Sequence, residues 1–146
     1  MLFRSGARDT LKRVIPGTKV DAAVSRFPGA FIGRIKKYQA ADKLADVVVL
    51  HPGTNGVIPE DMMRQMLDLL DDRTRVVVVN DAMPRSWREP NNKVIAKVVP
   101  DYANAVLADW ESASAGHPEY FVSDGVHLTA KGARAYAKLI KQSAGL

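Results

Sequence analysis

The apolar residues of the chain follow two different spacings, and this difference predicts its secondary structure. Residues 46–50 and 75–79 are runs rich in β-branched residues without polar alternation, which is typical of strands buried on both faces. Weaker strands are predicted over residues 20–24 and 105–108. The sequence therefore predicts a sheet whose inner strands are covered by helices on both sides.

Amphipathic helices are predicted between these strands and at both ends of the chain. Their expected ranges are residues 7–15, 30–44, 59–70, 92–99 and 130–141. Pro16-Gly17 ends the first helix, Pro59 opens the third, and Thr129 caps the last. Because strands and helices alternate, we predict a single α/β domain over residues 1–146. It is a three-layer α/β/α sandwich with a parallel sheet.

Composition narrows the chemistry that is available to the protein. The 146 residues include no cysteine, which excludes disulfide frameworks, thiolate metal sites and cysteine nucleophiles. No apolar run approaches the ~20 residues that span a bilayer, and residues 1–6 lack the apolar core of a signal peptide. By itself, the sequence predicts a soluble globular domain.

The charge balance is basic, with 21 Lys and Arg residues against 16 Asp and Glu residues. Ten of these basic residues precede Leu44, where they are interleaved with apolar residues as on the solvent-facing sides of helices. Aromatic residues are sparse and do not alternate with the basic ones, as a nucleic-acid-binding surface would require. We therefore expect no nucleic-acid partner, while attraction to anionic cell-wall polymers or lipid headgroups fits the charge equally well.

The sharpest chemical pattern lies just before the last predicted helix and reads Asp124-Gly125-Val126-His127. A histidine that acts as a base needs a carboxylate on its second ring nitrogen. The glycine permits a tight turn that folds Asp124 back onto the His127 imidazole. The alternative is that Asp124 caps a turn and His127 is an ordinary, half-buried histidine.

A second pattern follows the first buried strand and reads His51-Pro52-Gly53-Thr54-Asn55-Gly56. Its glycines let backbone N–H groups approach a ligand, and the Asn55 amide can donate to a developing oxyanion. The same residues also suit an ordinary glycine-rich turn. His51 has no second histidine nearby at metal-ligand spacing, so a packed histidine is the better interpretation.

A third pattern, in residues 80–87, offers Arg85 for an anionic group and Trp87 for an apolar or sugar face. The alternative is a solvent-exposed loop with one partly buried tryptophan. The sequence has no phosphate-binding loop, dinucleotide-binding glycine motif, zinc-protease motif or EF-hand. We therefore expect neither a cofactor nor a metal ion.

The order of these segments resembles the SGNH, or GDSL-like, hydrolase superfamily. Within it, the chain looks most like the extracytoplasmic domain attached to membrane acyltransferase-three proteins of the peptidoglycan O-acetyltransferase type. The resemblance covers residues 6–146 and is fairly specific. The residues that carry it are Val24-Ser25-Arg26, Leu50-His51-Pro52-Gly53-Thr54-Asn55-Gly56, Asn80, Pro84-Arg85, Trp87, Asp109-Trp110 and Ser123-Asp124-Gly125-Val126-His127-Leu128-Thr129.

The resemblance implies a flavodoxin-like fold of the SGNH type and acyl transfer through an acyl-enzyme, without a cofactor. His127 would be the general base and Asp124 the carboxylate that orients it. Asn55 would donate to the oxyanion, with help from backbone N–H groups near Ser25 and Gly53. The expected activity is therefore that of a serine esterase or O-acyltransferase.

The resemblance also implies a substrate and a location. Ser25, Arg26, Arg85 and Trp87 would contact an acyl ester, such as an acetyl ester, of a cell-wall or surface carbohydrate. The parent protein would carry an N-terminal membrane acyltransferase domain, which would hold this domain, as a monomer, outside the cytoplasmic membrane. An alternative function is a non-catalytic cell-surface module that binds glycan through Arg85, Trp87 and the basic face.

One part of the family pattern is missing from the beginning of the chain. In the family, a Gly-Asp-Ser motif ends the first strand, a few residues before the segment matched here by Gly6-Ala7-Arg8. The chain reads Met1-Leu2-Phe3-Arg4-Ser5 instead, without an apolar strand. We therefore expect residues 1–5 to be foreign or truncated and the first central strand to be lacking. Ser5 is a doubtful nucleophile, because catalysis requires placement within about an ångström. The chain is expected to be impaired in turnover.

Overall fold

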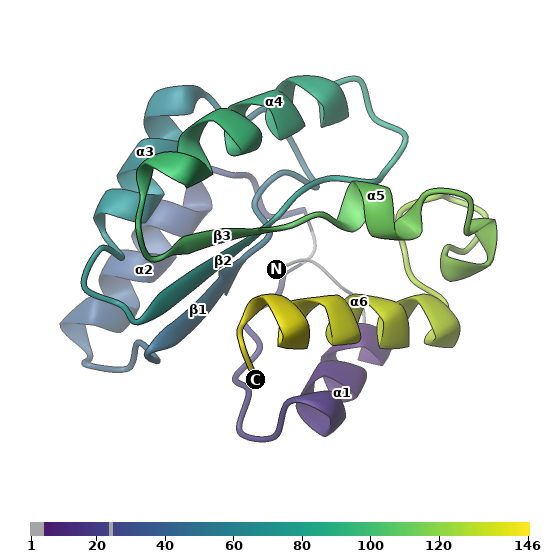
Figure 1. Cartoon of the computed structure of the whole chain (residues 1–146), viewed down its shortest axis with the longest axis horizontal. Helices are drawn as coiled ribbons and strands as arrows, with labels where there is room; N and C mark the ends of the chain where they lie inside the picture. Colours follow the sequence, from purple (N-terminus) through teal and green to yellow (C-terminus); the bar gives the residue numbers. More distant parts are fainter. Residues whose placement is uncertain (1–4, 24) are drawn as a thin grey trace.

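A parallel sheet lies at the centre of the structure, a computed structural model that describes residues 5–23 and 25–146. Its strands are β1 (Val47–Leu50), β2 (Arg75–Val79) and β3 (Ala105–Ala108), in the order β1-β2-β3 (Figure 1). In the register of the sheet, Val47 lies beside Arg75 and Val76 lies beside Ala105. The predicted α/β fold with a parallel sheet is confirmed.

Helices cover both faces of the sheet. On one side lie α2 (Ala30–Ala40), α3 (Glu60–Asp68) and α4 (Arg88–Val98), which continues into the short 3-10 helix η1 (Val99–Asp101). On the other side lie α1 (Ser5–Val14), α5 (Trp110–Ser114) and α6 (Ala130–Ser143), with the 3-10 helix η2 (Pro118–Tyr120) beside α6 (Figure 1). The sheet and the helices on its two faces therefore form the predicted three-layer α/β/α arrangement.

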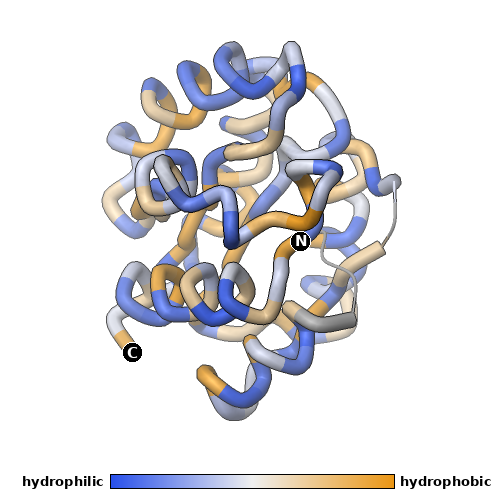
Figure 2. The backbone as a smooth tube through the Cα atoms, turned by 90° about the vertical axis from the view of Figure 1, so that its right-hand side faces the viewer, coloured by the Kyte–Doolittle hydropathy of each residue, from blue (hydrophilic) through white to orange (hydrophobic). Residues whose placement is uncertain are grey.

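The valines of β2 show why the layers form. Val76 and Val78 point into the core under α2, α3 and α4, whereas Val77 and Val79 point into the core under α1 and α6. All four side chains are completely buried. The hydrophobic segments run through the middle of the molecule, and the outer turns of the helices are mostly hydrophilic (Figure 2). A polar residue at any of these four positions would therefore face a core.

Strand β1 has a neighbouring strand on only one side within the described residues. Val48 packs against the core of α2 and α3, and Val47 and Val49 pack against the core of α1 and α6. These three valines are nevertheless only half-buried, whereas the valines of β2 are fully buried. The free edge of β1 leaves backbone N–H and C=O groups with which a further strand can pair.

The strand predicted over residues 20–24 is wrong in the part that the structure describes. Residues 18–23 have no regular secondary structure, and Val24 lies outside the described residues. A strand needs a neighbouring strand to accept its backbone hydrogen bonds, and this segment pairs with none of the described strands. Ion pairs hold it instead, because Asp21 lies 2.8 Å from the Arg26 guanidinium and 2.6 Å from that of Arg34.

The helix predicted over residues 30–44 ends at Ala40, because the chain leaves the helix at Asp42, whose φ is +51°. Two other helices also differ from the prediction for local reasons. Helix α4 begins at Arg88 instead of residue 92, because Pro90 lies in its first turn, where the missing N–H is not needed. Helix α5 was not predicted and begins after Asp109, whose side chain accepts a hydrogen bond from the Ser112 N–H. Among the helices of the described residues, none is both long and apolar enough to cross a membrane.

Candidate active site

The segment of residues 124–127 forms the tip of a short hairpin that connects η2 to α6. Phe121 and Leu128 pair across the hairpin as an antiparallel bridge, and the Val122 N–H donates to the His127 carbonyl at 2.9 Å. Gly125 turns the chain with a φ of +68°, a conformation that glycine adopts without strain. The glycine therefore makes the tight turn that the sequence predicted.

The turn brings Asp124 and His127 together. One carboxylate oxygen of Asp124 contacts His127 Nδ1, and the other accepts the N–H groups of Val126 and His127 at 2.8 and 2.9 Å. Hydrogen bonds from the imidazole and then from these N–H groups lower the pKa of Asp124 to about 2. The carboxylate is therefore ionised at neutral pH, and it orients the ring so that Nε2 is the nitrogen available for proton transfer.

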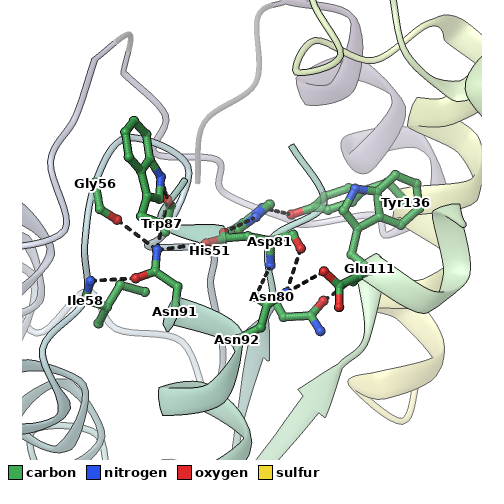
Figure 3. A network of polar contacts seen from close by, with 12 residues as sticks. His51, Gly56, Ile58, Asn80, Asp81, Trp87, Asn91, Asn92, Glu111 and Tyr136 are labelled. Carbon is green, nitrogen blue, oxygen red and sulfur yellow. Dashed lines mark hydrogen bonds and ion pairs between the residues drawn. The ribbon is translucent and has the colours of Figure 1, made fainter. Parts of the chain in front are cut away.

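Hydrogen bonds from the Asn91 side chain on α4 fix the loop of residues 53–56. The Asn91 side-chain amide donates to the Gly56 carbonyl at 2.8 Å, the Gly53 carbonyl at 3.3 Å and the Asp81 carboxylate at 2.9 Å (Figure 3). Its oxygen accepts the Ile58 N–H at 2.8 Å. Carbonyls on both sides of Asn55 are thus anchored to one side chain, which makes this loop a pre-organised element.

The two residues predicted to contact substrate in the 80–87 segment have different surroundings. Trp87 is half-buried, and its indole N–H donates to the Gly53 carbonyl at 2.9 Å (Figure 3). Arg85 is exposed, and its guanidinium makes no hydrogen bond or ion pair within the described residues. Trp87 therefore supports the 53–56 loop, while Arg85 is available to a ligand.

Asn55 lies beside the segment that contains Ser25 and Arg26. Its amide donates to the Arg26 carbonyl at 3.3 Å, and Ser25 is exposed with a φ of +58°. The Arg26 guanidinium is bound by Asp21. Burial raises the pKa of Asp21, but hydrogen bonds from Arg26 and Arg34 outweigh that effect and lower it to about 2. The structure therefore pairs the Arg26 side chain with Asp21 and leaves Ser25 open to solvent.

A buried polar network, which the sequence did not reveal, lies beneath the 53–56 loop. His51 Nδ1 is 3.0 Å from the Tyr136 hydroxyl, and Nε2 is 3.4 Å from a carboxylate oxygen of the fully buried Asp81 (Figure 3). Burial and the nearby Asp81 raise the pKa of Tyr136 well above its usual value. Tyr136 therefore keeps its hydroxyl proton, and its O–H can donate a hydrogen bond to His51 Nδ1. The ring proton of His51 is then on Nε2, which faces Asp81.

The sequence contained only part of the signal for this network. His51 directly follows one predicted strand and Asp81 is the second residue after another, at the edge of the sheet where α/β proteins bind ligands. Asn91 and Tyr136 lie on helices and carry no local pattern that distinguishes them from other helical residues. His51 is a packed histidine, as its lack of a second histidine ligand predicted.

The three sequence patterns lie next to one another in the folded chain. A small cavity of about 20 Å³ is lined by both Thr54 of the 53–56 loop and Val126 of the hairpin. The hairpin also packs on the 80–87 segment, because a Cβ atom added to Gly125 would lie 3.0 Å from Pro84. No group of three or more His, Asp or Glu side chains in the described part of the chain could hold a metal ion.

No family model matches the chain, but known proteins do. It is 36% identical over 130 residues to peptidoglycan O-acetyltransferase OatA of Listeria monocytogenes, covering 89% of the chain and 21% of that protein. It is 35% identical over 127 residues to O-acetyltransferase OatA of Staphylococcus aureus, covering 86% of the chain and 21% of that protein. The chain thus spans about a fifth of the length of the curated relatives that it matches.

Solved structures show the fold. The C-terminal catalytic domain of Streptococcus pneumoniae peptidoglycan O-acetyltransferase A superposes with a TM-score of 0.83 at 20% identity, covering 96% of this chain and 86% of that one. The chain has an SGNH hydrolase fold. An acetyl-xylooligosaccharide esterase from Geobacillus is similar to it with a TM-score of 0.73 at 14% identity, covering 96% and 79% of the two chains.

The SGNH fold agrees with the resemblance seen in the sequence, and homology to part of the OatA proteins supports it. The resemblance also implied a serine nucleophile, for which the sequence offered Ser5. Ser5 is the first residue of α1, and its side chain lies outside the described part of the structure. The expectation that Ser5 is a doubtful nucleophile therefore stays a prediction.

Substitution of Gly53 tests how tightly the 53–56 loop packs against Asp81. A Cβ atom at Gly53 would lie 2.0 Å from one Asp81 carboxylate oxygen and 2.5 Å from the other. We expect Gly53→Ala to lower the free energy of unfolding by about 2–3 kcal/mol, because neither the buried carboxylate nor the loop can move freely. The measurement is urea denaturation, combined with the NMR signal of the Trp87 indole N–H, which should shift as its bond to the Gly53 carbonyl changes.

Gly33→Ala is the matched control for this prediction. Gly33 lies in the middle of α2, and a Cβ atom there would meet nothing within 4 Å. This substitution should stabilise the protein by about 0.5–1 kcal/mol, because alanine favours a helix over glycine. A Gly53→Ala variant as stable as the original protein, with an unshifted Trp87 signal, would show that the loop is not held by Asp81.

Proposed function

We propose that this chain is the SGNH domain of a serine esterase or O-acyltransferase that acts on acyl esters of cell-wall carbohydrate. The observation that carries this proposal is the pairing of Asp124 with His127 on a hairpin that shares a cavity with the 53–56 loop. The substrate class is supported by the homologous proteins, which are peptidoglycan O-acetyltransferases.

In the proposed reaction, His127 Nε2 takes the proton of a serine hydroxyl while the serine oxygen attacks the acyl carbonyl carbon. The negative charge on the carbonyl oxygen is stabilised by the Asn55 amide and by backbone N–H groups near Gly53 and Ser25. His127 then gives its proton to the departing alcohol, which leaves an acyl-enzyme. A sugar hydroxyl or water attacks this ester, again with His127 as the base, and restores the serine.

The serine in this proposal comes from a Gly-Asp-Ser strand beside β1. The free edge of β1 supports this placement, because its half-buried valines can accept a further strand. The carboxyl end of a parallel strand at this edge would lie next to His51, which follows β1. Without such a strand, we expect the chain to lack the attacking group, since no Gly-Asp precedes Ser5.

The location and partners of the whole protein are part of the same proposal. The chain matches only about a fifth of its curated relatives, which is consistent with one domain of a larger protein. We propose that residues 6–146 form a single, monomeric domain outside the cytoplasmic membrane. An N-terminal membrane acyltransferase domain would anchor it there and supply the acyl groups.

The test of the proposed function is a gain of activity. An extended chain carries an additional apolar strand that ends in Gly-Asp-Ser ahead of residue 6. We expect it to hydrolyse an activated acetyl ester, such as 4-nitrophenyl acetate, faster than the chain without the extension. The matched control is the same extension ending in Gly-Asp-Ala, which restores the strand without the hydroxyl. Equal rates for the serine and alanine versions would refute the proposal.

A second candidate function is glycan binding without catalysis. It is favoured by the exposed Arg85 guanidinium, which lies in the same segment as the half-buried Trp87. This function predicts saturable binding of glycan fragments that weakens with added salt and is unaffected by His127→Ala. Isothermal titration calorimetry that detects no binding, together with a gain of esterase activity in the extended chain, would exclude it.

A further inference from the structure

A larger cavity opens beside the hairpin that carries Asp124 and His127. Its volume of about 520 Å³ lies within the range of small-molecule sites in proteins. It shares Ala82 and Phe121 with the small cavity between the hairpin and the 53–56 loop. A ligand in the larger cavity would therefore lie next to the candidate active site, and none of the residues assigned to catalysis lines it.

A fixed pair of charged side chains lies in this cavity. Arg88 Nε is 3.3 Å from a carboxylate oxygen of Glu111, and the same oxygen accepts the Asn92 amide at 3.0 Å. The backbone N–H of Glu111 donates to the Asn80 side chain at 2.9 Å, so that Glu111 is held from two sides (Figure 3). The site is thus built before any ligand arrives.

Part of this pair remains available for a ligand. The second carboxylate oxygen of Glu111 and the two terminal nitrogens of Arg88 make no hydrogen bond or ion pair within the described residues. The two side chains are 45% and 44% exposed, which leaves these atoms open to solvent. The cavity therefore presents a hydrogen-bond acceptor and several donors side by side.

The charges of the cavity decide which kind of ligand fits. It is lined by the carboxylates of Glu89 and Glu111, and each has a cationic partner, since Lys93 lies 3.0 Å from Glu89 and Arg88 lies 3.3 Å from Glu111. Among the described residues, the cavity therefore offers an anionic ligand no cation that is free of a carboxylate partner. A sugar hydroxyl both donates and accepts hydrogen bonds, and an acetamido group offers an N–H donor and a C=O acceptor, so a hydroxyl beside an acetamido group matches the Arg88–Glu111 pair. Phe121 adds an apolar surface for the C–H face of a ring.

We propose that this cavity binds an uncharged sugar ring of the glycan, next to the sugar whose hydroxyl group reacts. The proposal rests on the proposed function for the class of polymer that reaches the site. It goes further because it assigns recognition of the sugar to Arg88, Glu111 and Phe121, which are not among the proposed catalytic residues. It also states that the sugar is recognised through a hydroxyl and its neighbouring acetamido group, whereas the acidic groups of an attached peptide are not bound in this cavity.

The experiment uses the chain as it stands and a linear, uncharged tetramer of N-acetylglucosamine. Titration followed by NMR is expected to give saturable shifts at the amides of Glu111, Ser114 and Phe121. Glu111→Gln and Arg88→Ala should each weaken binding by about 3- to 10-fold, the effect of one lost hydrogen bond. Added salt should leave the affinity almost unchanged, because the ligand is neutral.

A matched control separates recognition from a general loss of surface charge. Glu60→Gln removes a similar ion pair, in which Glu60 lies 3.1 Å from Arg64 on α3, and it should not change the affinity. His127→Ala should also bind the tetramer normally, so a failure of the proposed catalysis would be seen separately from a failure of this site. Glu111→Gln keeps a side-chain oxygen that can accept the hydrogen bond from Asn92, so this variant is expected to fold.

Several results would overturn the proposal. One is the absence of saturable shifts. Another is a set of shifts centred on Arg85 and Trp87 that Arg88→Ala leaves unchanged, since this result would place the glycan on the 80–87 segment. Tighter binding of a short acidic peptide than of the tetramer would likewise assign the cavity to an anionic ligand.

Discussion

Replacing His127 by alanine in the extended, Gly-Asp-Ser-containing chain is expected to lower kcat for an activated acetyl ester by at least about 10⁴-fold. The imidazole is the base of the proposed reaction, on a hairpin that shares a cavity with the 53–56 loop, and without it the serine hydroxyl keeps its proton. Steady-state hydrolysis measures this loss, and KM should change little because the substituted side chain acts on the reacting proton. Circular dichroism verifies that the variant folds.

His117 provides the matched control for this experiment. Its Nδ1 lies 2.9 Å from a carboxylate oxygen of Glu119, and its side chain is 45% exposed, against 41% for His127. Both residues are thus exposed histidines with a carboxylate partner, but only His127 directly follows a residue, Val126, that lines the small cavity beside the 53–56 loop. His117→Ala should leave kcat unchanged. A His127→Ala variant that keeps the activity of the extended chain would show that another group is the base.

Replacing Asp124 by asparagine in the same extended chain is expected to lower kcat by roughly 10³-fold. Asparagine can still accept the N–H groups of Val126 and His127, but its charge is lost and it no longer favours the ring tautomer that leaves Nε2 free. Glu119→Gln, which disrupts the similar His117 pair, should keep full activity. Equal losses in both variants would indicate a general charge effect and contradict the role assigned to Asp124.

The same substitution also has an expected effect on stability that depends on pH. The pKa of Asp124 is lowered from its ordinary value of 3.8 to about 2 in the folded protein. The ionised carboxylate therefore stabilises the fold fully above about pH 4, and this contribution is lost as the pH falls towards 2. The difference in unfolding free energy between the original protein and Asp124→Asn should shrink over this range. It is expected to be small at every pH, because the pair is largely exposed.

The main elements of the fold were predictable because their signals are local. The strands at residues 47–50 and 75–79 consist mostly of valine, and the helices have apolar residues at helical spacing. The pairing of Asp124 with His127 was predictable for the same reason. The two residues are three positions apart, and the intervening Gly125 allows the required turn.

The strand expected at residues 20–24 shows where local signals are insufficient. Its apolar residues suit a strand, but a strand exists only when a neighbour accepts its backbone hydrogen bonds. The described residues contain no strand beside this segment, and Asp21 binds Arg26 and Arg34 instead. Pairing partners are set by the sheet as a whole, which no short window of sequence contains.

The sequence alone predicted the α/β architecture and a tight turn that brings Asp124 to His127, and it excluded cysteine chemistry. The network of His51, Asp81 and Tyr136 and the cavity with the Arg88–Glu111 pair became visible only in the folded chain. These groups join residues that are 23 to 85 positions apart. Spacing and periodicity describe neighbours along the chain, whereas such contacts depend on how helices pack against the sheet.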